Sequence, residues 1–173
     1  QVMKVKMAQA DMIGSAKASV SRLTGTFTGV LAGCGMGESA KVSLWVGEEN
    51  DEESLQQVGG PLDVSGGKFE FTYDLPKFEQ TYYWQFRAVS TSAGDTAVAT
   101  TRTDVATCRA LDTATYEWNG GTDGDWENPA NWKISSGEGL GYPNGKETTV
   151  QFPAGTKARI VLRGEMSVGN LWL

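Results

Sequence analysis

Apolar and polar side chains alternate over several short stretches of this chain, and this spacing limits its fold more than any other feature. In residues 81–90 the large apolar side chains stand at every second position: Tyr82, Trp84, Phe86 and Ala88. A period of two places such side chains on one face of a β-strand, whereas one face of a helix needs a period of about 3.6. We therefore expect an all-β chain whose strands each bury one face.

The same alternation recurs between segments rich in Gly, Asn, Asp and Pro, which favour turns. It covers residues 3–7, 18–31, 41–46, 68–73 and 97–108. The phase shifts within residues 18–31, because Val20 and Leu23 cannot share one face of a straight strand. We expect a bulge or a break near residues 22–24. Short strands at such regular spacing are typical of a β-sandwich.

The composition changes along the chain, which predicts two modules. The chain has 173 residues, enough for one large domain or two small ones. Most of its six tryptophans fall near the C-terminal end: Trp118, Trp126, Trp132 and Trp172. We therefore expect a sandwich over residues 1–112 and a small Trp-rich β unit over residues 113–173.

Charge and residue content exclude several functions. Lys and Arg number 15 against 21 Asp and Glu, a net charge of −6, whereas nucleic-acid and membrane-surface binding need a clustered basic face. No apolar run is long enough to span a membrane. Histidine is absent, which excludes every His-based nucleophile, base and metal ligand. No nucleic acid, membrane span or cofactor is therefore expected.

The segment around the strongest strand resembles a known family. Leu75 and Pro76 lead to Thr81, then Tyr82, then alternating apolar residues that end at Ala88. This order resembles the E–F corner and F strand of fibronectin type III-like domains, although Glu79-Gln80 replaces the family's Gly before the Thr. The resemblance covers residues 2–111. It implies an immunoglobulin-like sandwich, with Tyr82 as the corner tyrosine and Trp84 as a structural residue.

The C-terminal part resembles a narrower family. It carries Trp-x-Gly at 118–120, Gly-x-Trp at 124–126, Ala-Asn-Trp at 130–132, Pro143, Val-x-Phe at 150–152 and Val-x-x-Leu at 168–171. This order resembles the opening of autotransporter-associated β-strand repeat regions, although only Glu147 represents the usual acidic residue. Such repeats belong to large bacterial surface proteins and tend to build parallel β-helices. We expect a fragment whose further rungs are missing, because Leu173 stops the chain within an apolar alternation.

The two resemblances imply a non-catalytic structural or adhesive module at the bacterial cell surface or outside the cell. Its expected partners are other modules of the same protein, and host or environmental glycans or proteins. Ser65-Gly66-Gly67-Lys68 matches the letters of the S-x-x-K motif of penicillin-recognising enzymes. That motif needs a helix start, whereas two glycines before a strand favour a hairpin turn, so no enzyme is expected.

An alternative function is carbohydrate binding through the loops between residues 118 and 132. Trp126 and Trp132 could stack on sugar rings, with Asp123, Asp125 and Asn128 as polar partners. The two aspartates are also the better candidates for a calcium site, although without an ion they would form turns. The opposing interpretation is structural, and has Trp118 pack with both of these rings between the two modules. Exposure of the rings separates the two interpretations.

Cys34 and Cys108 are the two cysteines of the chain, and the sequence does not decide whether they form a disulfide. Two cysteines of a secreted protein usually pair. The sandwich prediction places Cys34 after the second strand and Cys108 at the end of the last. Those positions lie at opposite ends of a sandwich, beyond the limit of about 7 Å between the Cα atoms of a disulfide. A shifted strand register would reverse this, so both outcomes stay open.

Overall fold

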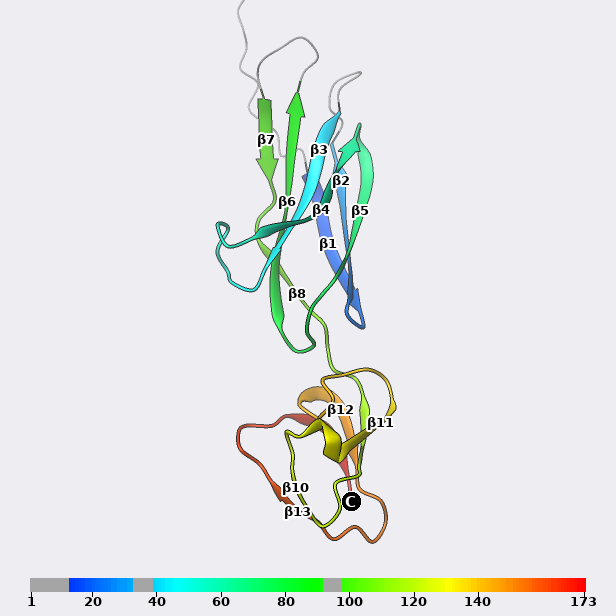
Figure 1. The fold of residues 1–173 in the computed structure, drawn as a ribbon. Helices are drawn as coiled ribbons and strands as arrows, with labels where there is room; N and C mark the ends of the chain where they lie inside the picture. The colour runs from blue at the N-terminus through cyan, green and yellow to red at the C-terminus, as the bar shows by residue number, and fades with distance from the viewer. Residues whose placement is uncertain (1–12, 33–38, 92–97) are drawn as a thin grey trace, which may run out of the picture. The chain divides into compact units, whose positions relative to one another are not determined.

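The computed structural model describes residues 13–32, 39–91 and 98–173 (Figure 1). Within these ranges the regular elements are β-strands and a single short 3-10 helix, so the predicted all-β class is confirmed. No helix in the same ranges is long and apolar enough to cross a membrane. The strand predicted at residues 3–7 and the residue Cys34 lie outside the described part of the chain.

The chain divides into two compact units. The first contains residues 1–20, 24–74 and 81–108, and the second contains residues 21–23, 75–80 and 109–173. The units therefore separate after Cys108, and the second also includes two short segments from earlier in the sequence.

The first unit is a β-sandwich of two sheets. Sheet one has the order β1-β2-β5 and contains β1 (Ile13–Ser21), β2 (Thr24–Leu31) and β5 (Gly67–Asp74). Sheet two has the order β4-β3-β6-β7, with β8 also paired to β6. It contains β3 (Ala40–Gly47), β4 (Gln56–Val64), β6 (Thr81–Thr91), β7 (Val98–Arg102) and β8 (Ala106–Arg109). The pairings of β2 with β5, and of β3 with β4 and β6, are antiparallel.

Aromatic side chains from both sheets meet in the core of this unit. Phe27 of β2 contacts Trp84 of β6 edge to face, with ring centroids 5.2 Å apart. Phe69 of β5 contacts Phe86 of β6 in the same manner at 4.9 Å. The predicted inward face of β6 is confirmed, because its four alternating apolar side chains, Tyr82 among them, are buried. Edge-to-face contacts of this kind are the favoured geometry for aromatic pairs.

Three details of the first unit refine the sequence analysis. The phase shift near residues 22–24 is a break between β1 and β2, where Arg22 has a φ of 56°. The run 97–108 forms two strands, β7 and β8, rather than one. Strand β4 was not predicted, because Gly59, Gly60 and Pro61 are poor strand formers. They are tolerated here because β4 is an edge strand, whose pairing with β3 shifts register.

The second unit is built from shorter strands. They are β9 (Thr115–Trp118), β10 (Asp123–Asp125), β11 (Trp132–Ser136), β12 (Gly145–Gln151), β13 (Arg159–Val161) and β14 (Val168–Trp172), with the 3-10 helix η1 at Pro129–Asn131. One sheet has the order β11-β9-β12-β14, and a second pairs β10 with β13. Three of these four pairings, β9–β12, β12–β14 and β10–β13, are parallel, and only β11 and β9 run antiparallel. Parallel strands are not joined by hairpins, so the turn signals in the sequence could not have indicated these three pairings.

The parallel pairings show that the chain passes twice through the same two-strand arrangement. We call residues 115–125 the first coil and residues 145–161 the second coil, each containing one strand of either sheet. In the larger sheet Val150 of the second coil lies beside Tyr116 of the first and beside Leu171 of β14. In the smaller sheet Arg159 lies beside Asp123. The second coil therefore lies on the first, and β14 lies on the second.

Candidate functional site

The three tryptophans that could have bound a sugar are buried inside the second unit. Trp118, Trp126 and Trp132 are 5%, 8% and 7% exposed, and they share a core cluster with Ala114, Tyr116 and Val150. The ring centroids of Trp126 and Trp132 are 4.8 Å apart, and those of Trp118 and Trp132 are 5.0 Å apart. The alternative function required Trp126 and Trp132 to be exposed, and the prediction that these rings are exposed is wrong.

The expectation that these rings pack between two modules is also corrected, because their partners belong to the second unit itself. The buried cluster contains only two aliphatic side chains, Ala114 and Val150. Its volume is therefore filled mainly by large rings, each of which buries a large area.

Each indole N–H in this core donates a hydrogen bond to a backbone carbonyl. The Nε1 of Trp118 donates to Gly121 O at 3.0 Å, and the Nε1 of Trp132 donates to Trp126 O at 2.7 Å. The Nε1 of Trp126 donates to Pro143 O, also at 2.7 Å. A buried ring with a bonded N–H packs the core and fixes a loop at once. The tryptophans therefore hold the loops that connect the short strands.

Two glycines of the Trp motifs are required by the ring of Trp118. A Cβ atom at Gly120 would lie 2.5 Å from that ring, and one at Gly124 would lie 2.6 Å from it. Real Cβ atoms do not approach other atoms this closely, so both positions exclude a side chain. The Gly between the two aspartates at 123 and 125 is thus explained by packing rather than by cation binding.

Asp123 and Asp125, the candidate calcium ligands, form ion pairs with arginines, and Asp125 also accepts a backbone hydrogen bond. The Nε of Arg163 donates to Asp125 Oδ2 at 2.8 Å, and the backbone N–H of Glu127 donates to Asp125 Oδ1. These bonds lower the pKa of the Asp125 carboxyl, with the Arg163 bond as the main cause. Asp123 pairs with Arg159 at 3.7 Å. In the described residues no three His, Cys, Asp or Glu side chains gather as metal ligands would.

Asn128, the third polar residue of the predicted sugar site, caps the 3-10 helix η1. Its Oδ1 accepts from the backbone N–H of Ala130 at 3.0 Å, and Pro129 stands in the first turn of η1. The proposed sugar-binding set is thus dispersed: its two rings are buried, and its polar groups are used in ion pairs and a cap.

A buried carboxylate, Asp112, was missed as a site residue. Its side chain is fully buried and accepts hydrogen bonds from the backbone N–H groups of Ala114 and Leu140 and from the Tyr116 hydroxyl at 2.7 Å. Burial, followed by the bond to Asp112, raises the pKa of Tyr116. The backbone N–H of Asp112 in turn donates to Glu79 Oε1 at 2.7 Å. A bond to the residue two positions on is an Asx turn, the one sequence signal that could have suggested this site.

The remaining predicted site residues belong to the first unit. Tyr82 and Trp84 are buried in the sandwich, as a structural role requires. Cys108 has a partly buried thiol with no disulfide partner among the described residues, and burial raises its pKa to about 11. Its predicted partner Cys34 lies outside the described residues, so the disulfide stays a prediction.

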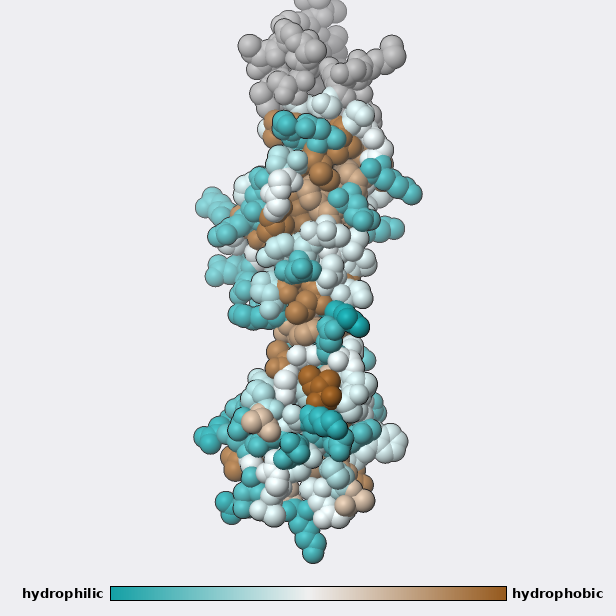
Figure 2. All heavy atoms as spheres, turned by 45° about the vertical axis from the view of Figure 1, so that its right-hand side comes forward, coloured by the Kyte–Doolittle hydropathy of each residue, from teal (hydrophilic) through white to brown (hydrophobic). Residues whose placement is uncertain are grey.

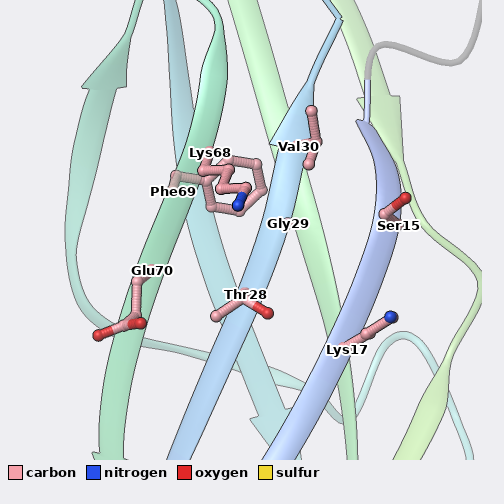
Figure 3. Close-up of a pocket in the computed structure, with 8 residues that line it drawn as sticks. All are labelled: Ser15, Lys17, Thr28, Gly29, Val30, Lys68, Phe69 and Glu70. Atoms are coloured by element: carbon pink, nitrogen blue, oxygen red, sulfur yellow. The ribbon is translucent and has the colours of Figure 1, made fainter.

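A hollow of about 500 Å³ opens on sheet one of the sandwich. Figure 3 shows its lining, which comes from all three strands of that sheet: Ser15 and Lys17 of β1, Thr28, Gly29 and Val30 of β2, and Lys68, Phe69 and Glu70 of β5. The aromatic ring in this hollow belongs to Phe69, which is 6% exposed and packs against the core. The hollow therefore offers charged and hydroxyl groups but no aromatic face.

The second unit has an apolar hollow of about 540 Å³ beside its last strand. Its lining is Phe152, Pro153, Ala154, Gly155, Thr156, Ala158, Ile160 and Leu173. Figure 2 shows one face of the chain, on which apolar residues form a broad area over the first unit and small separate patches over the second. The large exposed apolar side chains of the second unit include Val161, Leu162, Leu171, Trp172 and Leu173. These residues belong to, or directly follow, β13 and β14.

Comparisons with known proteins give little support for assigning a function. No family model matches the chain, and no curated protein matches it. A similar solved structure is that of a protein from Bacteroides uniformis ATCC 8492, provisionally described as a carbohydrate binding protein. The match has 16% sequence identity and a TM-score of 0.41, and it covers 56% of this chain and 55% of the other. The chain thus spans about half the length of that protein, and a likeness this weak says nothing about function.

Proposed function

We propose that this chain is a non-catalytic structural module of a large bacterial surface or secreted protein. In this proposal the sandwich is a spacer, and the second unit is the first part of a stacked β-solenoid. The surface location derives from the two family resemblances in the sequence. The structural role is supported by the parallel stacking of the two coils and β14, which is the observation that carries the proposal.

The chemistry of the candidate residues supports the same role. Asp112 is used to bind two backbone N–H groups and a hydroxyl. Asp125 binds Arg163, and the three buried indoles bind loop carbonyls. Groups that could have bound a ligand are therefore engaged in holding the fold.

A glycan array tests this proposal against carbohydrate binding. The full chain is applied with and without calcium, after near-UV circular dichroism has shown that it is folded. We expect no saturable binding to any glycan. Specific binding that is lost in Trp172→Ala would overturn the proposal, because Trp172 is 63% exposed and could present its ring. Binding that is lost in Lys68→Ala would overturn it too, and would place the glycan in the hollow on sheet one.

A further inference from the structure

Two short segments of the second unit come from much earlier in the sequence than the rest of it. Residues 21–23 lie at the turn from β1 to β2, and residues 75–80 connect β5 to β6. Both nevertheless group with residues 109–173 rather than with the strands that they connect. A segment so distant in the sequence must be held in the second unit by specific contacts of its own residues.

Each of these two segments contains a charged residue with a left-handed backbone. Three non-glycine residues of the described part have a positive φ, and two of them lie here: Arg22 at 56° and Glu79 at 59°. Such a φ is unfavourable for a residue with a Cβ atom, and it persists where other contacts compensate for it. Both side chains form ion pairs within residues 109–173, Arg22 with Glu138 and Glu79 with Arg109.

Glu79 is bound through both of its carboxylate oxygens and through its backbone. The Nη2 of Arg109 donates to Oε2, and the backbone N–H of Asp112 donates to Oε1 at 2.7 Å. The backbone N–H of Glu79 itself donates to Ala110 O, also at 2.7 Å. A Cβ atom on Gly145 would lie 2.8 Å from Oε1, so the glycine that begins β12 leaves room for this carboxylate.

Burial separates the contributions of the two ion pairs. The side chains of Arg22 and Glu138 are 74% and 46% exposed, and an ion pair in such a position contributes little to stability. The side chain of Glu79 is only 13% exposed, and one of its bonds is to the backbone of Asp112, which is fully buried. A partly buried carboxylate with charged and backbone donors contributes more. Glu79 is therefore the main point of attachment.

We propose that Glu79 is a positioning residue that holds residues 75–80 in the second unit, and that this unit reaches its full stability only with the segment bound. The proposal goes beyond the spacer role and does not depend on it. A cut after residue 112, where the composition changes, would remove part of the second unit. Because residues of the segment itself make the contacts, they do not require the strands on either side to be folded.

Two glycine substitutions in the full chain test the proposal. Glu79→Gly and its matched control Arg22→Gly each place at a left-handed position the residue that tolerates it best. Only the first removes a partly buried carboxylate. A third variant, Arg109→Gln, leaves residues 75–80 unchanged and removes one of the two side-chain partners. Hydrogen exchange is measured at the amides of β9 and β12 for the second unit and of β3 and β6 for the sandwich.

We expect Glu79→Gly to speed exchange in β9 and β12 about tenfold or more, with exchange in β3 and β6 unchanged or slower. Complete loss of protection in the second unit alone would be the extreme form of this result. Arg22→Gly should change exchange less than about twofold. Arg109→Gln should have an intermediate effect, which is absent when it is added to Glu79→Gly because the two residues share one contact.

Three outcomes would overturn the proposal. Unchanged or slower exchange of β9 and β12 in Glu79→Gly would show that the carboxylate does not hold the segment. Equal acceleration in both units would show that Glu79 serves the whole chain rather than the second unit. Equal effects of Glu79→Gly and Arg22→Gly would assign the change to the turn backbone. None of these outcomes alters the glycan-array result, so the two proposals fail separately.

Discussion

The two units bury aromatic rings by different means, and the comparison shows what a small β unit needs. The sandwich has long antiparallel strands, and in its core the rings of Phe27, Phe69, Trp84 and Phe86 meet edge to face. The indole N–H of Trp84 is buried there and has no hydrogen-bond partner among the described residues. In the second unit the strands are three to seven residues long, and all three buried indoles donate to loop carbonyls.

This difference indicates that strand length determines how strongly the fold depends on side-chain hydrogen bonds. Long strands fix the backbone through their own ladders, so a ring needs only to fill space. Short strands leave most of the backbone in loops, whose carbonyls must find donors when they are buried. We infer that the second unit depends on the N–H groups of its three buried indoles, whereas the sandwich does not depend on the N–H of Trp84. The predictions below test this contrast, from the largest expected effect to the smallest.

The largest effect is expected from Trp132→Ala. Trp132 contacts the rings of Tyr116, Trp118, Trp126 and Phe152, so its removal opens a cavity at the centre of the second unit. We expect a loss of about 4 kcal/mol, which unfolds this unit while the sandwich stays folded. Trp84→Ala is the matched variant, and should unfold the sandwich and leave the second unit intact. NMR amide spectra of both variants check this, and simultaneous loss of both sets of signals in either would contradict it.

A smaller but substantial effect is expected from Asp112→Asn. The carboxylate Oδ1 accepts from the Ala114 N–H, and Oδ2 accepts from the Tyr116 hydroxyl and the Leu140 N–H, so an amide NH₂ at either position would face a backbone donor. We expect the free energy of unfolding of the second unit to fall by about 2–3 kcal/mol. Denaturant unfolding measures this change. Asp123→Asn, at an exposed position of the same unit, should change it little, and equal losses in the two variants would argue against a special role for Asp112.

The contrast in indole bonding is sharpened by Trp→Phe substitutions. Both Trp132→Phe and Trp84→Phe remove part of a ring, but only the first leaves a buried carbonyl, Trp126 O, without its donor. We expect Trp132→Phe to cost about 1–3 kcal/mol more than Trp84→Phe, each measured on its own unit. If the two losses are equal, the indole N–H groups of the second unit do not contribute as we propose.

The sequence predicted the first unit better than the second, for physical reasons. A strand such as β6 presents enough alternating residues to show its buried face, so Tyr82 and Trp84 were placed correctly. Strands of three to five residues show too little periodicity, and parallel partners lie far apart in the sequence. Tryptophan is equally suited to a core and to a sugar site, so Trp126 and Trp132 could not be assigned by residue type. Asp112 accepts a hydrogen bond from the backbone of Leu140, and no local sequence pattern connects these two residues.

The smallest effect concerns acid and the pair of Asp125 with Arg163. The folded pKa of Asp125 lies below its unfolded value of about 3.9, because Arg163 and the Glu127 N–H bind the ionised form. Its contribution to stability is therefore present above pH 4 and lost as the pH falls through the folded pKa. Asp125→Asn should be slightly less stable than the unchanged chain at pH 7 and indistinguishable from it at the acid end of a pH series. A difference that persists in acid would show that the variant acts by another route.

The central claim is that the second unit is a stack of parallel strands, and the most direct test is the pattern of proton contacts around Val150. In parallel pairing, nuclear Overhauser effects connect the amide and α protons of Val150 with those of strands β9 and β14 near Tyr116 and Leu171, and close α–α contacts are missing. We expect this pattern on both sides of Val150. Strong α–α contacts from Val150 to either strand would show antiparallel pairing and would contradict the stacked-coil account.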